Sequence, residues 1–325
     1  MKAVVSRSTG PADVRVVEVG SPAPGPDEIV VKVKASALNR ADLLQVLGLY
    51  PAPHGVPADI PGLEYAGEVA QLGARVTRWK VGDRVMGIVG GGAWAEELVT
   101  HEREAIAVPD GVDLARAAAI PEAFITAFDA LILQAGLTRG QSALIHAVAS
   151  GVGTAALQLC RLWGAQAIGT GRNAAKLERA KQLGLEHGVL VKDGAFSAQV
   201  KQHTGGRGCQ VALDLVGGAW FPQTVDCLAP GGTLMLVGLV GGVAAEAPLR
   251  QILSQKLRIV GTTLRSRALE EKIAVARQFE AQVVPAFARG ALEPVIDATL
   301  PFSSVREGLD RLAANDSFGK LVLTW

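Results

Sequence analysis

The feature that most constrains the fold is the alternation of short apolar segments with amphipathic ones between Gln141 and about residue 267. The apolar segments are SALIHA, AQAIGT, HGVLV, VALDLV, TLMLVGL and RIVGTTL. Amphipathic segments such as TAALQLCRLWG and AAKLERAKQLG separate several of them. Short, continuously apolar strands separated by helices are typical of a parallel sheet that is covered on both faces. We therefore predict a doubly wound α/β domain in this part of the chain.

The chain before this region is rich in β-forming residues. KAVVS, VRVVEV and EIVVKVKA are short and rich in valine, and VGDRVMGIVGGGAWAEELVT continues the pattern with glycine breaks. A short helix is expected near Arg40 to Leu47. Residues 113–136 then form a helical run in which Pro121 allows a break.

The C-terminal part returns to a mixed pattern. One long helix is expected over EEKIAVARQFEAQVVPAFARG, followed by VIDATLP, a short helix near SSVREGLDRLAAN and a final strand, KLVLTW. A chain of 325 residues is long enough for about two domains. We predict that residues 1–122 and 267–325 form a β-rich domain and that residues 123–266 form the α/β domain.

Composition argues against several classes of partner. The 32 Lys and Arg residues nearly balance the 31 Asp and Glu residues, so no basic surplus favours nucleic acid or an anionic membrane. The N-terminus lacks an apolar run of signal-peptide length, and we find no stretch of about 18 uncharged apolar residues. Cys160, Cys209 and Cys227 are scattered and odd in number. A disulfide framework is not expected, and we predict a cytoplasmic protein with no membrane partner.

The strongest local signal is ALIHAVASGVGTAALQL, in which a strand over residues 143–147 leads through small residues into a helix. Gly151 and Gly153 allow the backbone to approach a pyrophosphate, and the free N–H groups of the helix start face its negative charge. Val148 and Ser150 fill the first two positions of a strict G-x-G-x-x-G pattern. An ordinary βα turn is the alternative interpretation, but the strand–turn–helix–strand context favours a dinucleotide site.

The end of the second strand indicates which dinucleotide binds. NAD-specific folds place Asp or Glu about 20 residues past the glycines, to bind the ribose hydroxyls. Here the sequence has Gly171 followed by Arg172, with Lys176 one helical turn later. Either cation alone could be an ordinary solvated charge. Because no carboxylate is present to repel a 2′-phosphate and two cations could bind it, we predict NADPH.

The order of several motifs resembles a known family. SALNRADL, PGLEYAG, VGDRV, AAAIPEAFITAFDAL, HAVASGVGTAALQL, LDLVGG and GKLVL together resemble the zinc-independent quinone oxidoreductases of the medium-chain dehydrogenase/reductase superfamily. IPEAFITAF, HAVASGVGTAA and LRSR are similar to the tumour-suppressor-inducible quinone oxidoreductase subgroup, which is related to zeta-crystallin. The resemblance covers nearly the whole chain.

The resemblance implies a GroES-like catalytic domain built from both chain ends and a Rossmann domain, with the active site in a cleft between them. It also implies a homodimer paired through the Rossmann sheets and the NADPH-dependent reduction of quinones.

Zinc is not expected. Zinc-dependent relatives hold the catalytic metal with two cysteines and a histidine, but this chain has Asn39 in the first position and Leu63 in the histidine position. A structural zinc lobe needs about four clustered cysteines, and residues 80–120 contain none. His54 and His101 lack partners at zinc-site spacing and are expected to be ordinary histidines. Without the metal as Lewis acid, hydride transfer by the cofactor remains.

By resemblance, the expected catalytic residues are Asn39, Tyr50 and Thr126. Tyr50 and Thr126 are expected in the cleft and Asn39 beside the nicotinamide, although Tyr50 could instead be an aromatic residue that packs a loop. Relatives often carry a tyrosine where this chain has Val191, so Arg172 would bear more of the 2′-phosphate. The residues expected to bind the cofactor are Arg40, Ala41, Ser150, Gly151, Val152, Gly153, Gly171, Arg172, Lys176, Gly238, Val240, Leu264, Arg265, Ser266, Phe318, Gly319 and Lys320.

Two other functions stay open at this point. An enoyl or other activated-alkene reductase would need the same cofactor and no metal. A crystallin-like structural or RNA-binding protein would need no turnover, but a net charge of +1 and the lack of a basic, aromatic stripe argue against RNA. We predict an NADPH:quinone oxidoreductase.

Overall fold

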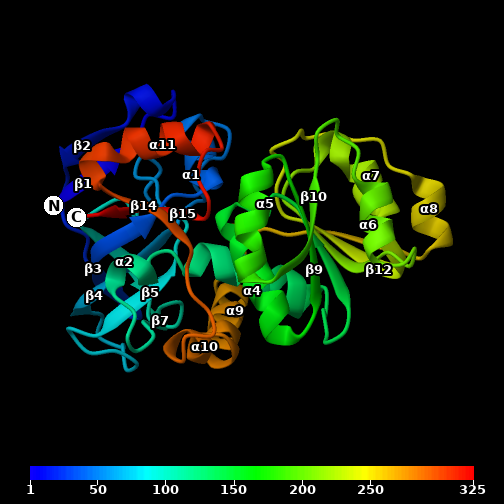
Figure 1. The fold of residues 1–325 in the computed structure, drawn as a ribbon. Coiled ribbons are helices and arrows are strands. Elements are labelled where there is room, and N and C mark those ends of the chain that lie inside the picture. The colour runs from blue at the N-terminus through cyan, green and yellow to red at the C-terminus, as the bar shows by residue number, and fades with distance from the viewer. The chain divides into compact units, whose positions relative to one another are not determined.

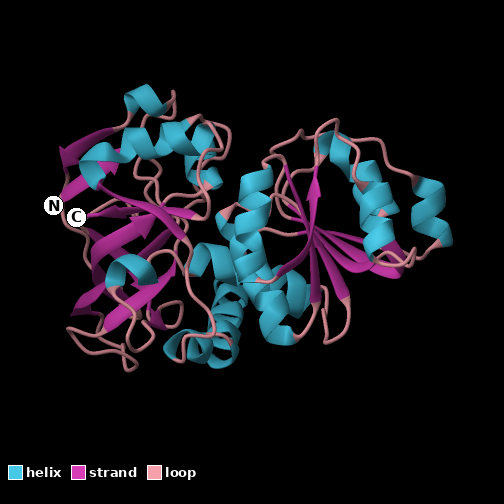
Figure 2. Ribbon diagram, viewed as in Figure 1, coloured by secondary structure: helices cyan, strands magenta, loops and turns pink.

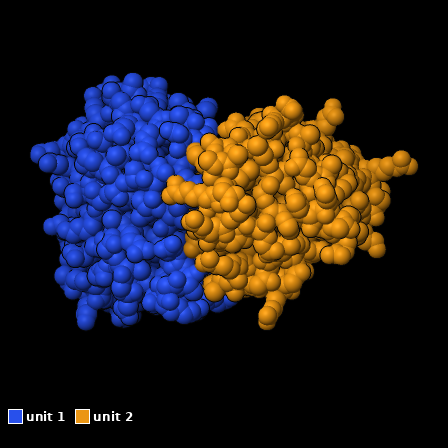
Figure 3. Space-filling view, viewed as in Figure 1, with its two compact units in different colours: residues 1–125, 264–325 blue, residues 126–263 orange.

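The computed structural model describes residues 1–325, and the chain divides into two compact units, coloured in Figure 3. Unit 1 comprises Met1–Ile125 and Leu264–Trp325, and unit 2 comprises Thr126–Thr263. The divisions fall at residues 125 and 264, whereas the sequence predicted 122 and 267. A helical run passes through residue 125 without a break, so no turn in the sequence marks that boundary.

Unit 2 is a parallel sheet flanked by helices, as Figures 1 and 2 show. The strands follow the order β10-β9-β8-β11-β12-β13, so the chain starts in the middle of the sheet and builds outward in both directions. This order is that of a Rossmann fold, and the prediction of a doubly wound α/β domain is confirmed. The strands are β8 (Ser142–Ile145), β9 (Gln166–Gly171), β10 (Leu185–Leu190), β11 (Cys209–Asp214), β12 (Leu228–Leu236) and β13 (Arg258–Gly261).

The helices of unit 2 lie on both faces of its sheet. In Figure 1, α4 and α5 lie on one side of the strands and α6 and α7 on the other. Their buried apolar residues cover the strands. The helices are α4 (Gly151–Trp163), α5 (Ala174–Ala180), α6 (Ser197–His203), α7 (Phe221–Asp226) and α8 (Leu249–Ser254).

The buried His146, which directly follows β8, forms hydrogen bonds to β9 and to α7. The ring nitrogens of His146 lie 2.8 Å from the hydroxyl oxygens of Thr170 and Thr224, and the rings of Phe196 and Trp220 pack edge-on against the imidazole. Burial lowers the pKa of His146 to about 4. The imidazole is therefore neutral near pH 7, donating one hydrogen bond and accepting the other.

Unit 1 is built around a largely antiparallel sheet with the strand order β14-β15-β3-β4-β5-β7, to which β6 adds by pairing with β3. Because the C-terminal strand β15 pairs with β3, both ends of the chain build this unit. The strands are β3 (Glu28–Ala37), β4 (Glu64–Leu72), β5 (Arg84–Ile88), β6 (Glu97–His101), β7 (Ile106–Ala107), β14 (Ile296–Pro301) and β15 (Lys320–Thr324), and β1 (Lys2–Val5) pairs separately with β2 (Arg15–Glu18).

Short helices pack around this sheet. They include α1 (Arg40–Val46), α2 (Leu114–Ala117) and α11 (Val305–Ala313). The prediction of one long helix after residue 269 is wrong, because the structure has α9 (Leu269–Gln282) and α10 (Val284–Ala288) with a break at Val283. Pro285 has no N–H to continue the helical ladder and constrains the residue before it, so the helix ends and restarts.

The apolar run near residue 121 breaks where predicted. After α2, a π-helix runs over Pro121–Ile125, then α3 (Thr126–Phe128) and a second π-helix over Asp129–Gln134. By length and composition alone the span Leu114–Gln134 could cross a membrane, but 78% of its most apolar window is buried in the protein. Such burial is typical of core helices, so the span is weak evidence for a membrane segment.

We expect acid to destabilise the fold through His146. The unfolded imidazole has a pKa near 6.5 and the folded one about 4, so the unfolded state binds more protons between these values. The free energy of unfolding should therefore fall by about 3 kcal/mol as the pH drops from 6.5 to 4. Chemical denaturation at several pH values measures this.

The variant His146→Gln should lose this part of the pH dependence, whereas replacement of the exposed His54 by Gln should not. An identical pH slope in His146→Gln and the wild type would contradict the assignment.

Candidate active site

The predicted glycine turn joins β8 to α4 in a compact arrangement. Ser150 is the N-cap of α4, and its hydroxyl accepts a hydrogen bond of 3.0 Å from the backbone N–H of Gly153. A Cβ on Gly153 would lie 2.5 Å from the carbonyl oxygen of Ala147, so only glycine fits there. Ala147 itself adopts a left-handed φ of 50°, which a residue with a side chain rarely adopts. The first turn of α4 thus lies against the strand end, with helix-start N–H groups available to an anion.

The end of β9 lies beside this turn because β9 pairs with β8 in parallel. Arg172 directly follows β9 and is exposed, and Lys176 lies in the first turn of α5, half-buried. The N-cap of α5 is Asn173, whose side chain accepts a hydrogen bond of 3.1 Å from the Lys176 backbone. Val191 donates its backbone N–H to the Gly171 carbonyl (2.9 Å) while its side chain is buried. The two predicted cations therefore follow the carboxyl end of β9.

Two further loops complete the same edge of unit 2. Asp214, the last residue of β11, accepts hydrogen bonds from the backbone N–H groups of Val216 (2.8 Å) and Gly217 (2.9 Å). A Cβ on Gly218 would lie 2.3 Å from the Gly241 carbonyl, so the loops after β11 and β12 touch through backbone alone. The predicted cofactor-binding residues that follow the carboxyl ends of parallel strands, the edge where such sheets bind dinucleotides, are Ser150, Gly151, Val152, Gly153, Gly171, Arg172, Lys176, Gly238 and Val240.

A buried polar network lies in unit 1. The ammonium of Lys320 lies 2.6 Å from Glu64 Oε1 and donates a hydrogen bond of 2.5 Å to Asn39 Oδ1. The Asn39 amide in turn donates to Glu64 Oε1 (2.9 Å). All three side chains are buried, Glu64 completely. An ion pair out of contact with water is maintained only when hydrogen bonds satisfy both partners, and Asn39 provides them here.

Two more carboxyl groups adjoin this network. Asp42 is fully buried and accepts hydrogen bonds from the backbone N–H groups of Asn39 (2.8 Å) and Gly62 (3.2 Å). Glu122 donates its own backbone N–H to Glu64 Oε2 (2.8 Å). Burial raises the pKa of Asp42 to about 7, while the Asn39 hydrogen bond opposes the rise. Burial, with the nearby Glu64 charge, raises the pKa of Glu122 to about 8.

These three acids were not predicted from the sequence as site residues. Glu64 and Glu122 lie inside PGLEYAG and IPEAFITAF, two segments that are otherwise almost free of charge. A single charge in an apolar segment is a signal for a buried, partnered group, and it could have identified both. Asp42 follows Asn39 at the spacing of a capping box, which has a purely structural explanation.

Arg265 anchors the segment that carries Tyr50. Its guanidinium donates to the carbonyl oxygens of Gly90 (2.7 Å) and Tyr50 (3.1 Å) and to the Gln45 side chain. The guanidinium carbon also lies 4.9 Å from the centroid of the Tyr50 ring, a cation–π contact. The Tyr50 hydroxyl has no hydrogen-bond partner within the chain. The aromatic ring is therefore held by Arg265 while its hydroxyl stays available.

The remaining residues predicted to bind the cofactor or act in catalysis lie outside the polar network and the glycine turn. Arg40 donates to the Leu312 carbonyl (2.8 Å) and the Asn315 side chain (2.7 Å), both at the end of α11. Phe318 is buried, and Gly319, with a φ of 90°, lies against the Val295 carbonyl. Thr126, buried, is the first residue of unit 2, whereas Ala41, Leu264 and Ser266 belong to unit 1. Their roles toward a cofactor stay predictions.

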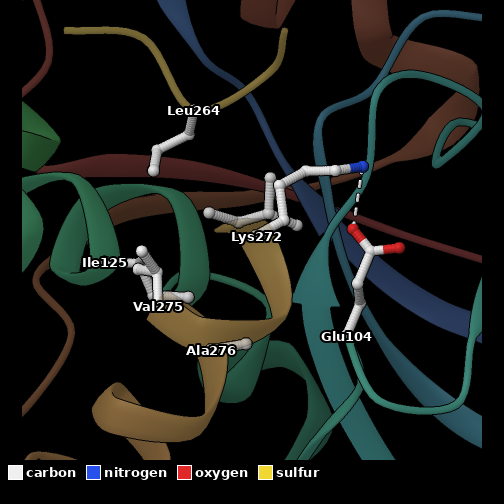
Figure 4. Close-up of a pocket in the computed structure, with 7 residues that line it drawn as sticks. Glu104, Ile125, Leu264, Lys272, Val275 and Ala276 are labelled. Atoms are coloured by element: carbon white, nitrogen blue, oxygen red, sulfur yellow. Dashed lines mark ion pairs between the residues drawn. The ribbon is translucent and has the colours of Figure 1, made fainter. Parts of the chain in front are cut away.

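Leu264 lines a small, mostly apolar pocket of unit 1, shown in Figure 4. Ile125, Val275 and Ala276 form much of its wall. At one side the Lys272 ammonium and the Glu104 carboxylate pair at 2.9 Å. Both ions are thus neutralised by each other, and the pocket offers chiefly apolar contacts.

We expect the loss of the Arg265 guanidinium to destabilise unit 1. In Arg265→Met the stem is preserved, but three hydrogen bonds and the contact with Tyr50 are lost. Charge-assisted hydrogen bonds contribute about 1.5–3 kcal/mol each, and we expect a net loss of about 3 kcal/mol because the losses are not additive. Chemical denaturation measures the change.

The exposed Arg289, replaced by Met, is the matched control and should change the stability little. Equal stabilities of Arg265→Met and the wild type would contradict the anchoring role.

Comparisons with known proteins agree with this architecture. Residues 25–110 match the family model described as alcohol dehydrogenase GroES-like domain, and residues 151–281 match the model described as zinc-binding dehydrogenase. The chain is 35% identical over 304 residues to a quinone oxidoreductase of Pseudomonas aeruginosa, covering 92% of both chains. It is 29% identical over 311 residues to quinone oxidoreductase-like protein 2 of Bos taurus, covering 95% of this chain and 88% of that one.

The fold is also similar to that of a solved structure. The quinone oxidoreductase of Pseudomonas syringae pv. Tomato DC3000 superposes with a TM-score of 0.90 and 29% identity, covering 100% of this chain and 99% of that one. The β-rich unit 1 thus contains a GroES-like domain and unit 2 a Rossmann domain, as the resemblance implied. The chain belongs to the medium-chain dehydrogenase/reductase superfamily and is an oxidoreductase related to its quinone oxidoreductases.

Proposed function

We propose that this protein is a zinc-independent NADPH:quinone oxidoreductase. The observation that carries the proposal is the buried Lys320 ammonium, which is bonded to both Asn39 and Glu64. Asn39 occupies the position where zinc-dependent relatives carry a metal-binding cysteine. A cation that belongs to the chain itself thus neutralises the nearby carboxylate, and a divalent ion added beside it would be repelled. The names of the relatives support a quinone as the acceptor.

The residues at the edge of unit 2 fit a dinucleotide. The first turn of α4 offers backbone N–H groups to a pyrophosphate, and its glycine packing lets the backbone come close. Arg172 is exposed and its planar guanidinium can form two charge-assisted hydrogen bonds to a 2′-phosphate. Lys176 adds a second positive charge one turn later. With Gly171 in place of an acidic residue, these groups support NADPH over NADH.

In unit 1 the proposal assigns different roles to Asn39 and Tyr50. The bound nicotinamide supplies the hydride. The Asn39 amide is used by Glu64, Lys320 and the Ala37 carbonyl (3.2 Å), so we assign it a positioning role. The Tyr50 hydroxyl has no partner in the chain and can donate a hydrogen bond to the negative charge that develops on the acceptor oxygen.

A homodimer paired through β13 is part of the proposal. β13 is the last strand of its sheet, so one row of its backbone N–H and C=O groups has no strand partner. The apolar side chains of Leu249, Leu253 and Val243 are strongly exposed nearby in sequence, and Ile259 on β13 is exposed as well. Exposed apolar side chains beside an unpaired strand edge favour burial against a second copy of the chain, in a symmetric interface.

We also propose a cytoplasmic location. Cys160, Cys209 and Cys227 are all free and buried, and none is paired in a disulfide. Three unpaired thiols are typical of proteins in a reducing compartment.

We expect purified protein to oxidise NADPH with a simple quinone and to keep this activity after exhaustive chelation. The reason is that the Lys320–Glu64–Asn39 network replaces a metal-binding cluster. Steady-state assays with a quinone and with an enone, together with metal analysis, measure this.

Zinc at about one per chain, with turnover abolished by chelation, would contradict metal independence. Turnover with the enone alone would assign the protein to the activated-alkene reductases. NADPH binding without turnover of either acceptor would favour a role that is not enzymatic.

We expect Arg172→Ala to weaken NADPH binding about tenfold and to leave NADH nearly unchanged. A charge-assisted hydrogen bond contributes about 1.5–3 kcal/mol, and solvent exposure of Arg172 places the effect at the lower end. Dissociation constants for both cofactors measure the change, with the exposed Arg207, replaced by Ala, as the control.

An equal loss for both cofactors would show that Arg172 does not meet the phosphate. Gly171→Asp should shift preference toward NADH, although its Cβ would lie 3.1 Å from Leu177 Cδ2 and that side chain must move.

A further inference from the structure

We propose that Glu122 is the proton donor of the reaction, delivering to the reduced acceptor the one proton that hydride transfer leaves unsupplied. This inference rests on the proposed function and extends it to a residue that the sequence analysis did not identify. It does not depend on whether the acceptor is a quinone or an enone, because both need one proton after the hydride.

The stoichiometry defines the step. A hydride brings two electrons and one hydrogen nucleus, and the acceptor then carries one negative charge on oxygen. In the proposed step the O–H bond of the Glu122 carboxyl breaks and its electron pair stays on the carboxylate. A new O–H bond forms on the acceptor oxygen, and solvent returns a proton to Glu122 before the next turnover. Atoms and charge balance with no further reactant.

The charges of the cluster require one stored proton. Three carboxyl groups adjoin one another, Asp42 on α1, Glu64 on β4 and Glu122 at the start of the π-helix. Asp42 and Glu122 both interact electrostatically with Lys320 and Arg265, and Glu64 pairs with Lys320. Only two cations face them, Lys320 on β15 and Arg265 after β13. Three negative charges against two positive ones in a desolvated site leave one excess charge, and binding a proton removes it.

The hydrogen bonds decide which carboxyl group holds that proton. Asp42 accepts two backbone N–H groups, and Glu64 accepts bonds from Lys320, Asn39 and the Glu122 backbone. Such bonds favour the charged form of an acid. The Glu122 carboxyl accepts no hydrogen bond from the chain, so its negative form has only the charges of Lys320 and Arg265 to offset burial and the neighbouring acids. The raised pKa of Glu122, about 8, agrees with this assignment.

Position and access suit the donor role. Glu122 is the one carboxyl group of the three that keeps partial exposure to solvent, whereas Asp42 and Glu64 are fully buried. A fully buried acid could not regain its proton quickly. Burial raises the pKa of Tyr50, Arg265 opposes the rise, and the Glu122 charge adds to it, so Tyr50 and Glu122 interact electrostatically and share Arg265 as a neighbouring cation. Tyr50 is the residue proposed to bind the acceptor oxygen.

The kinetic test compares Glu122→Gln with Glu122→Asp and with Glu18→Gln, which replaces an exposed carboxyl group of unit 1. The wild-type kcat/KM should fall as the pH rises through about 8, because the donor must be protonated. Glu122→Gln should lower kcat/KM at pH 7 about a hundredfold and abolish this alkaline decline. Glu122→Asp should retain a decline, and Glu18→Gln should resemble the wild type. A wild-type rate and pH profile in Glu122→Gln would overturn the proposal.

A spectroscopic test needs no turnover. Infrared difference spectra of the wild type across this pH range should contain the C=O stretch of a protonated carboxyl group that disappears near pH 8. The component that titrates near pH 8 should be missing in Glu122→Gln, whereas the component of Asp42, whose pKa burial raises to about 7, should remain. The Glu122 component should also titrate at lower pH in Glu64→Gln, where two acids face two cations and no stored proton is needed.

The two tests separate failure of this inference from failure of the proposed function. If the wild type reduces no acceptor, the proposed function fails, and the spectrum still shows whether Glu122 holds the proton. If the wild type is active but the component near pH 8 is missing, or survives in Glu122→Gln, the inference is overturned and the function stands.

Discussion

The buried ion pair between Lys320 and Glu64 is the interaction on which the arrangement of unit 1 depends. It joins β15, at the end of the chain, to β4, which lies in the first quarter. Asn39, the N-cap of α1 two residues after β3, bonds to both partners, so the starts of β4, β15 and α1 are joined in one polar network. Removing either ion would leave the other buried without a partner, which is strongly destabilising. The return of the C-terminal tail is therefore tied to the chemistry of the site as well as to the sheet.

The same ion pair affects the ionisation of the neighbouring acids Asp42 and Glu122. With Lys320 committed to Glu64, only Arg265 remains to offset Asp42 and Glu122, and Arg265 is itself engaged with Gly90, Gln45 and Tyr50. The cluster is thus one positive charge short of balance. In water this deficit would cost little, but in a desolvated site it changes which groups are ionised. A structural ion pair thereby favours a proton on a neighbouring acid.

In unit 2, close backbone packing fixes the loops that follow the carboxyl ends of the strands. At the carboxyl ends of β8, β11 and β12, glycines bring one loop against another where a Cβ would not fit. His146 stabilises this edge through hydrogen bonds to Thr170 on β9 and to Thr224 on α7. Arg172 directly follows β9 and Lys176 lies in the first turn of α5, so both cations are attached to this closely packed edge. A phosphate site needs such support because charge-assisted hydrogen bonds depend on geometry as well as on charge.

The sequence by itself determined the parallel sheet of unit 2 and the glycine turn before α4, because each follows from local periodicity or from a contiguous motif. It also indicated the family, through motifs spread along the chain. The break at Val283 was missed, although Pro285 was visible, because the apolar pattern of the flanking segments is equally compatible with one helix. Only the tertiary structure decided the partners of Lys320 and Arg265 and the grouping of Asp42, Glu64 and Glu122. These contacts join residues far apart in sequence, and their energies depend on burial and distance, which no single segment of the chain encodes.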